Sequence, residues 1–145
     1  GIRLSEFEFK AFEKYREDLE RLEKKDLNEI NRKSVNLVAA RYLRDVNFLT
    51  PVGNYSQDSG RVGGTLRRGW TIDGLAKKRG NNYEVDVINP VEYASYVNFG
   101  HRTRNGGFVE GQFFAERAAE QTGREVQREL DKLITREIRR ALGGN

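Results

Sequence analysis

The sequence contains no cysteine and only one histidine. The lack of cysteine excludes disulfide bonds and thiolate metal ligands, and a single histidine leaves too few donors for a zinc site. We therefore expect no metal and no cofactor. There is no run of about 18 apolar residues, so we expect no membrane-spanning segment. The charged N-terminal residues also do not resemble a signal peptide.

No set of catalytic residues can be assembled from the sequence. His101 stands beside Arg102 and Arg104 rather than beside a carboxylate, whereas a general base needs an oriented partner. The glycine-rich residues 63–65 (GGT) lack the lysine of a phosphate-binding loop. The acidic residues are spread along helical faces, where pairing with cations four residues away accounts for them. The sequence thus predicts a protein that is not an enzyme, with a hydrolase acting through His101 as the weaker alternative.

The charge is unevenly distributed along the chain. Of 145 residues, 37% are hydrophobic and 33% are charged, which is a lean apolar content for a globular protein. We expect a single domain over residues 1–145 that exposes long helical faces or completes its burial against neighbours. Residues 61–104 hold 8 Lys/Arg and 4 Asp/Glu, so their charge of 8 − 4 = +4 equals the net charge of the whole chain.

Residues 1–48 are predicted to be helical. Ser5 and Glu8 have the spacing of a capping box, and apolar residues follow at intervals of three and four. A second capping-box pattern begins at Asp26, so the helix either breaks there or continues with a bend. Thr50 precedes a proline and therefore ends the helical region.

The rest of the chain alternates loops with regular patterns. Residues 49–64 hold four glycines and are predicted to be a long loop. Residues 65–89 are predicted to be a β-hairpin with strands near 68–75 and 82–89, because apolar and polar residues alternate there. Residues 90–111 are predicted to be a short helix and a basic loop, and residues 112–142 a C-terminal helix that Gly123 weakens or bends.

These patterns together predict an α+β fold. It has a helical N-terminal region, a small antiparallel β-sheet and a long C-terminal helix packed on the sheet.

Two groups of residues are candidates for contacts with other molecules. The first group is mostly aromatic, and its members are predicted to be anchors in a subunit interface or in the core of one subunit; the sequence leaves both open. They are Trp70, Tyr93, Tyr96, Phe99, Gly100, Phe113 and Phe114. The second group is basic, lies in or beside loops, and is predicted to contact nucleic acid or an acidic protein partner. Its members are Arg61, Arg67, Arg68, Lys77, Lys78, Arg79, His101, Arg102 and Arg104.

Three motifs, taken in order, give the sequence a resemblance to a known family. Thr50-Pro51-Val52 is followed by residues 64–70 (GTLRRGW), then by residues 93–100 (YASYVNFG), and then by residues 111–118 (GQFFAERA). Together they resemble a tail-component or neck family of tailed bacteriophages of the lambda-like lineages, over roughly residues 35–120. Two departures are residues 53–63, which look like an insertion, and His101, where the family commonly has threonine.

The resemblance implies a structural role. Such proteins form a ring, often six-fold, that joins the tail to the head or completes the tail at its head-proximal end. The expected partners are further copies of the chain, with a hexamer favoured, and neighbouring head–tail connector, tail-tube or sheath proteins, together with the DNA in the channel. The expected location is the neck or tail of a virion or tail-like particle, assembled in the bacterial cytoplasm. The alternative is a stand-alone nucleic-acid-binding module that uses the basic loops.

Overall fold

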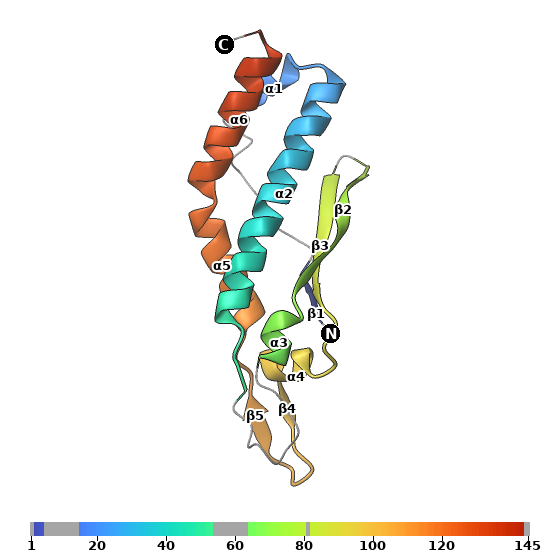
Figure 1. Ribbon diagram of the computed structural model, residues 1–145, viewed down its shortest axis with the longest axis vertical. Helices are drawn as coiled ribbons and strands as arrows, with labels where there is room; N and C mark the ends of the chain where they lie inside the picture. Colours follow the sequence, from blue (N-terminus) through green and yellow to red (C-terminus); the bar gives the residue numbers. More distant parts are fainter. Residues whose placement is uncertain (1, 5–14, 54–63, 81, 144–145) are drawn as a thin grey trace.

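The computed structural model describes residues 2–4, 15–53, 64–80 and 82–143 (Figure 1). The predicted capping box at Ser5 and Glu8, and Arg61, lie outside these residues. The helices and strands along the chain are β1 (Ile2–Leu4), α1 (Arg16–Glu20), α2 (Lys24–Leu49), α3 (Thr65–Arg68), β2 (Thr71–Arg79), β3 (Asn82–Asn89), α4 (Ala94–Phe99), β4 (Gly100–Arg102), β5 (Phe108–Glu110), α5 (Phe114–Glu125) and α6 (Gln127–Ala141).

The strands form two antiparallel sheets. In the larger sheet β3 lies between β1 and β2, and the smaller sheet is a hairpin of β4 and β5. The register between β2 and β3 shifts between Asp73 and Lys77. Gly74 lies within this irregularity with a φ of 78°, a backbone angle that glycine adopts without strain. A β-bulge of this kind interrupts the regular pairing of the two strands.

Helix α2 lies between two layers (Figure 1). Helices α5 and α6 cover one of its faces, and strands β2 and β3 cover another. The α+β fold class is therefore as predicted. In detail, the C-terminal helical segment rests mainly on α2. It shares a core cluster with the sheet only near its start, where Phe114 and Val87 belong to the same group.

The lower of two core clusters joins all three layers. Tyr42 of α2 is fully buried and donates a hydrogen bond of 3.1 Å from its hydroxyl group to the carbonyl oxygen of Ala115. Burial raises the pKa of this phenol. Trp70 packs edge-to-face against both Tyr42 and Phe114, with ring centroids 6.3 and 6.2 Å apart. Its indole nitrogen donates to the hydroxyl oxygen of Thr50 over 2.8 Å, so the buried polar atoms of this cluster are satisfied.

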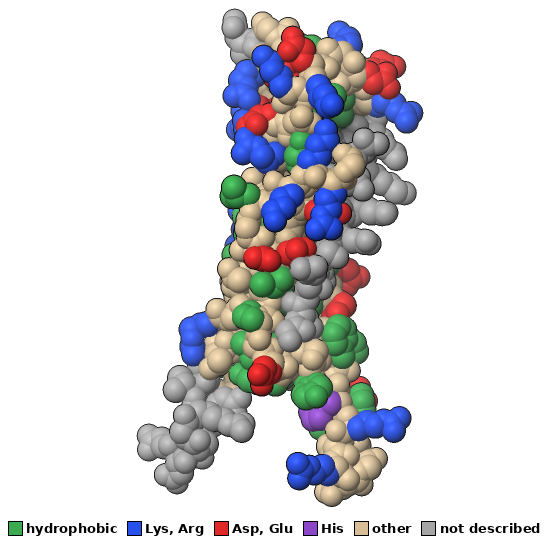
Figure 2. Space-filling view, turned by 90° about the vertical axis from the view of Figure 1, so that its right-hand side faces the viewer, with side chains coloured by type: hydrophobic (Ala, Val, Ile, Leu, Met, Phe, Trp, Pro, Cys, Tyr) green, Lys and Arg blue, Asp and Glu red, His purple; other side chains and the backbone are tan. Residues whose placement is uncertain are grey.

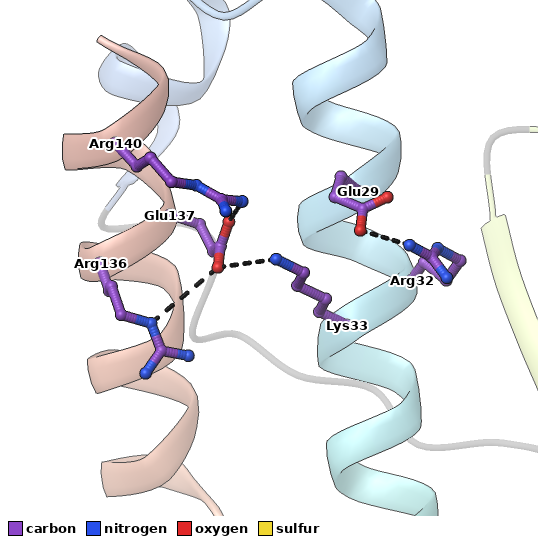
Figure 3. Close-up of polar contacts among 6 residues, drawn as sticks. All are labelled: Glu29, Arg32, Lys33, Arg136, Glu137 and Arg140. Atoms are coloured by element: carbon purple, nitrogen blue, oxygen red, sulfur yellow. Dashed lines mark hydrogen bonds and ion pairs between the residues drawn. The ribbon is translucent and has the colours of Figure 1, made fainter. Parts of the chain in front are cut away.

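The upper cluster joins α2 to α6. It consists of Leu22, Ile30, Val38, Val126, Leu130, Ile134 and Ile138. Ion pairs flank the apolar contact: the Lys33 Nζ lies 3.0 Å from Glu137, whose side chain is only 5% exposed, and Arg140 and Arg136 approach the same carboxylate (Figure 3). On α2 itself, the hydrogen bond from Arg32 lowers the pKa of Glu29. The nearly buried carboxylate of Glu137 needs its cationic partners, because an unpaired charge is costly to desolvate.

Several predicted boundaries differ from the structure. The first strand of the large hairpin begins at Thr71 rather than near residue 68, because the residues before it form α3. Helix α2 runs without interruption from Lys24, while the separate short helix α1 precedes it. The break in the C-terminal helix falls at Val126, shortly after Gly123. Part of the predicted basic loop is the hairpin of β4 and β5, whose strands of three residues are too short to show a period.

Replacing Phe114 by alanine should lower the free energy of unfolding by about 3 to 5 kcal/mol, because a fully buried ring would leave a cavity. The matched control is Phe113→Ala, since the neighbouring ring is 46% exposed; its effect should stay below about 1 kcal/mol. Urea denaturation followed by circular dichroism measures both. Equal losses for the two variants would show that this description of the core is wrong.

Replacing Gly123 by alanine should raise the free energy of unfolding by about 0.5 to 1 kcal/mol. Gly123 lies inside α5, and a methyl group there would meet no atom within 4 Å. The gain arises because alanine loses less backbone entropy than glycine on forming a helix. The same denaturation assay tests it, and a destabilised variant would contradict the helical assignment at this position.

Candidate assembly surface

Helix α4 and the β4–β5 hairpin form a projection at one end of the molecule, away from the C-terminus (Figure 1). The Asn98 side chain connects this projection to α5 through hydrogen bonds. This side chain is fully buried, donates to both carboxylate oxygens of Glu116 at 3.0 and 2.9 Å, and accepts the backbone N–H of Ala115 at 3.0 Å. The first turn of α5 therefore receives an acceptor from α4 in place of a cap on its own segment.

Two glycines let the hairpin fold back against the end of α4. Gly100 has a φ of 84°, and a side chain there would overlap the Val109 carbonyl oxygen. A side chain at Gly111 would overlap the carbonyl oxygen of Asn98. Only glycine permits this close approach of backbones. The chain can therefore pass directly from α4 into β4 at Gly100, which follows the last residue of the helix and is the first residue of the strand.

Phe113 has the only positive φ among the described non-glycine residues, 49°. The left-handed region costs a bulky L-residue roughly 1 to 2 kcal/mol. The ring gains little burial in return, since it stays 46% exposed and contacts Phe99 edge-to-face at a centroid distance of 6.5 Å. Backbone strain is concentrated at functional sites, which makes the half-exposed Phe113 a candidate for a contact with another molecule.

Among the described residues, the projection carries most of the exposed aromatic side chains. Tyr96 is 59% exposed, Phe99 50% and Phe108 58%, and Tyr93 and Val109 are also exposed. We call Tyr93, Tyr96, Phe99, Phe108, Val109 and Phe113 the aromatic surface. Figure 2 shows apolar side chains gathered beside the histidine at the base of the projection. By contrast, Trp70 and Phe114 are buried in the core, so the predicted anchors divide into two sets.

The basic residues, which are close in sequence, are far apart along the long axis of the molecule. Lys77, Lys78 and Arg79 are exposed near the turn between β2 and β3, whereas Arg102 and Arg104 are exposed on the β4–β5 hairpin (Figure 1). Arg79 lies 3.5 Å from Glu84 across the strands, and Lys78 donates to Asn28 over 3.4 Å. The basic middle section of the sequence is therefore not one patch.

The other predicted basic residues have local roles or surroundings. Arg67 donates to the backbone carbonyl oxygens of Thr50 and Phe48 at 3.0 and 3.2 Å. The guanidinium group of Arg67 satisfies carbonyl oxygens at the C-terminal end of α2 and complements the negative end of the helix dipole. We therefore do not include Arg67 among the residues proposed to contact another molecule. Arg68 is exposed at the end of α3. The His101 ring lies 5.5 Å from the Tyr96 ring, and its Nδ1 is buried with no hydrogen-bond partner in the described part of the chain.

Sequence reasoning missed three contributors to this end of the molecule. Phe108 and Val109 stood in a predicted loop, where the two adjacent apolar residues were the only signal. Asn98 was not singled out, because its hydrogen bonds reach residues of a different helix. Such a tertiary role leaves no periodic trace in a sequence.

The comparison with protein families gives the class of protein to which this fold belongs. Residues 13–100, more than half of the chain, match the HK97-gp10-like family, described as "Bacteriophage HK97-gp10, putative tail-component". The chain belongs to this family of phage tail components. The predicted resemblance is thereby confirmed, while the β4–β5 hairpin, α5 and α6 lie mostly or wholly beyond the matched residues.

No curated protein and no solved structure matches the chain. Within the described ranges, no helix combines the length and the apolar character that crossing a bilayer requires.

Replacing Asn98 by alanine should lower the free energy of unfolding by about 2 to 3 kcal/mol, because the buried N–H of Ala115 would lose its acceptor. The projection should also loosen, which amide hydrogen exchange of residues 100–111 would detect as faster exchange. Ser95→Ala, on the same short helix, is the control and should change neither quantity. Slow exchange in the Asn98 variant would show that other contacts hold the projection.

Proposed function

We propose that this tail component is a subunit of a ring that joins or completes the tail at its head-proximal end. The observation that carries the proposal is the aromatic surface on the projection. Aromatic rings are the preferred centres of protein interfaces, and adjacent exposed rings on a monomer mark a contact site. Burying one such side chain stabilises a complex by about 1.5 to 3 kcal/mol before the costs of association.

The position of the aromatic surface supports a ring over a two-fold dimer. The surface lies at one end of a long molecule, and a contact between that end and a different part of the next copy is heterologous; repeated with a suitable rotation, such a contact closes into a ring. We assign the complementary surface to the outer side of β2. Leu75 is 80% exposed there and Asp73 is exposed beside it, which complements the apolar and basic character of the projection.

The basic side chains of the projection extend the same contact. Arg102 and Arg104 stand beside the aromatic surface, and charges around an apolar centre favour orientation and rate of association more than affinity. The ring would then present its remaining faces to a head–tail connector, tail-tube or sheath protein in the virion. A six-fold ring is the state that the family resemblance favours.

The stand-alone nucleic-acid-binding alternative receives less support. It relies on the basic loops, and the β2–β3 turn and the β4–β5 hairpin that carry most of them are far apart along the molecule (Figure 1).

Replacing both Tyr96 and Phe108 by serine should convert the oligomeric ring to monomers, because the variant loses two apolar side chains of the proposed interface. Both side chains are more than half exposed, so they contribute little to the fold of one subunit. Native mass spectrometry and negative-stain imaging, alone and with the candidate tail tube, give the subunit count. Circular dichroism should show an unchanged fold.

The matched control for this experiment is Leu142→Ser. Leu142 is 42% exposed but follows α6 at the other end of the molecule, so its replacement should leave the ring intact. A wild-type protein that stays monomeric with the tail tube present, or a double variant with an unchanged subunit count, would refute the proposed interface.

A further inference from the structure

Helix α6 separates its charges between two sides. Each of its three carboxylates contacts the body of the protein: Glu129 lies 2.6 Å from Arg41, Asp131 accepts a hydrogen bond of 3.2 Å from Tyr15, and Glu137 lies 3.0 Å from Lys33. Arg140 joins the Glu137 group (Figure 3). The remaining cations are Arg128, Lys132, Arg136 and Arg139, and all four are exposed.

These four cations share one face of α6. Their spacings of four, four and three residues keep successive side chains on the same side of an α-helix. At a rise of about 1.5 Å per residue the row extends for about 16 Å. We call Arg128, Lys132, Arg136 and Arg139 the basic face. The net charge of this part of the sequence does not reveal the basic face, because residues 105–145 hold equal numbers of cations and carboxylates.

Among the residues that the structure describes, few carboxylates neutralise the basic face. Arg128, Lys132 and Arg139 form no ion pair with any residue that the structure describes. Arg136 reaches Glu137 only at 3.9 Å while its own side chain is 71% exposed. Like charges at these spacings destabilise a helix, so the fold gives no reason for their alignment.

The composition of the basic face fits phosphate groups better than a protein. A protein interface needs an apolar centre from which water is excluded, and the residue that lies among these cations on the helix surface is the polar Thr135. Three of the four cations are arginines, whose planar donors match phosphate oxygens in pairs. We propose that the basic face of α6 binds the phosphate backbone of duplex DNA.

The location of the basic face lets DNA and a neighbouring subunit bind together. Helix α6 runs to the end of the molecule opposite the β4–β5 hairpin (Figure 1), so the two surfaces do not compete. The proposal also stands apart from the ring, since a monomer carries the whole basic face. One copy should bind DNA without sequence preference, with a dissociation constant on the order of 10⁻⁶ to 10⁻⁴ M at physiological salt.

The test is fluorescence anisotropy of a short duplex DNA of mixed sequence, titrated with the full chain between about 50 and 200 mM salt. The test variant combines Arg128→Gln, Lys132→Gln and Arg139→Gln, which have no ion pair to lose among the described residues. The control combines Lys77→Gln, Lys78→Gln and Arg79→Gln, which removes the same charge from the β2–β3 turn. Native mass spectrometry of both variants shows separately whether the ring forms.

We expect the test variant to bind DNA at least about ten-fold more weakly at the lowest salt. The slope of log K against log salt should become shallower by about 2.7, because each of the three phosphates that the protein no longer neutralises removes about 0.9 from the slope. The control should stay within about two-fold of the wild type, and the thermal midpoint of the test variant should be equal or higher because repulsion along the helix is relieved.

Four results would overturn the assignment. They are a wild type that does not bind DNA, a test variant that binds as the wild type does, equal losses in both variants, which would indicate net charge alone, and poly-glutamate binding as tightly as DNA, which would indicate an acidic protein partner instead. A wild type that forms no ring while its DNA binding follows the expected pattern would refute only the proposed function.

Discussion

The structure depends on helix α2 having two apolar faces. One face packs against α5 and α6, and another packs against β2 and β3. Small residues on both sides, Ala39 on α2 with Ala115 and Ala118 on α5, are buried where the helices meet, and small side chains allow close helix packing. A three-stranded sheet and a pair of helices would each leave an uncovered apolar side without α2 between them. Burial of the Tyr42 side chain and its bond to Ala115 fix the relative position of these layers.

This arrangement makes the molecule long and separates its ends. Helix α2 has 26 residues, which is about 39 Å of helix, and the other layers run alongside it. The middle of the molecule is therefore occupied by packing, and the surfaces with other character fall at the two ends. One end carries the aromatic surface on the projection. The other carries α6 with its basic face.

The sequence predicted the elements with clear periods and failed where a role depends on tertiary contacts. Long helices and the large hairpin followed from apolar spacing. Phe113 and Phe114 could not be told apart, because their different burial comes from the left-handed φ of Phe113. Arg67 was predicted to point to a partner, yet the end of α2 lies within its reach. The basic face was hidden for a similar reason, since only the fold shows which charges of α6 turn inward.

The features that oppose folding lie toward the two ends of the molecule. Phe113 holds a strained backbone, the aromatic surface keeps apolar rings in water, and the basic face aligns like charges on a helix. None of them is needed to complete the core, because the two clusters around α2 close without them. A protein that acted alone would gain stability by removing all three. Their presence on a member of a tail-component family is explained if each is relieved by a partner: a second copy at one end and a polyanion at the other.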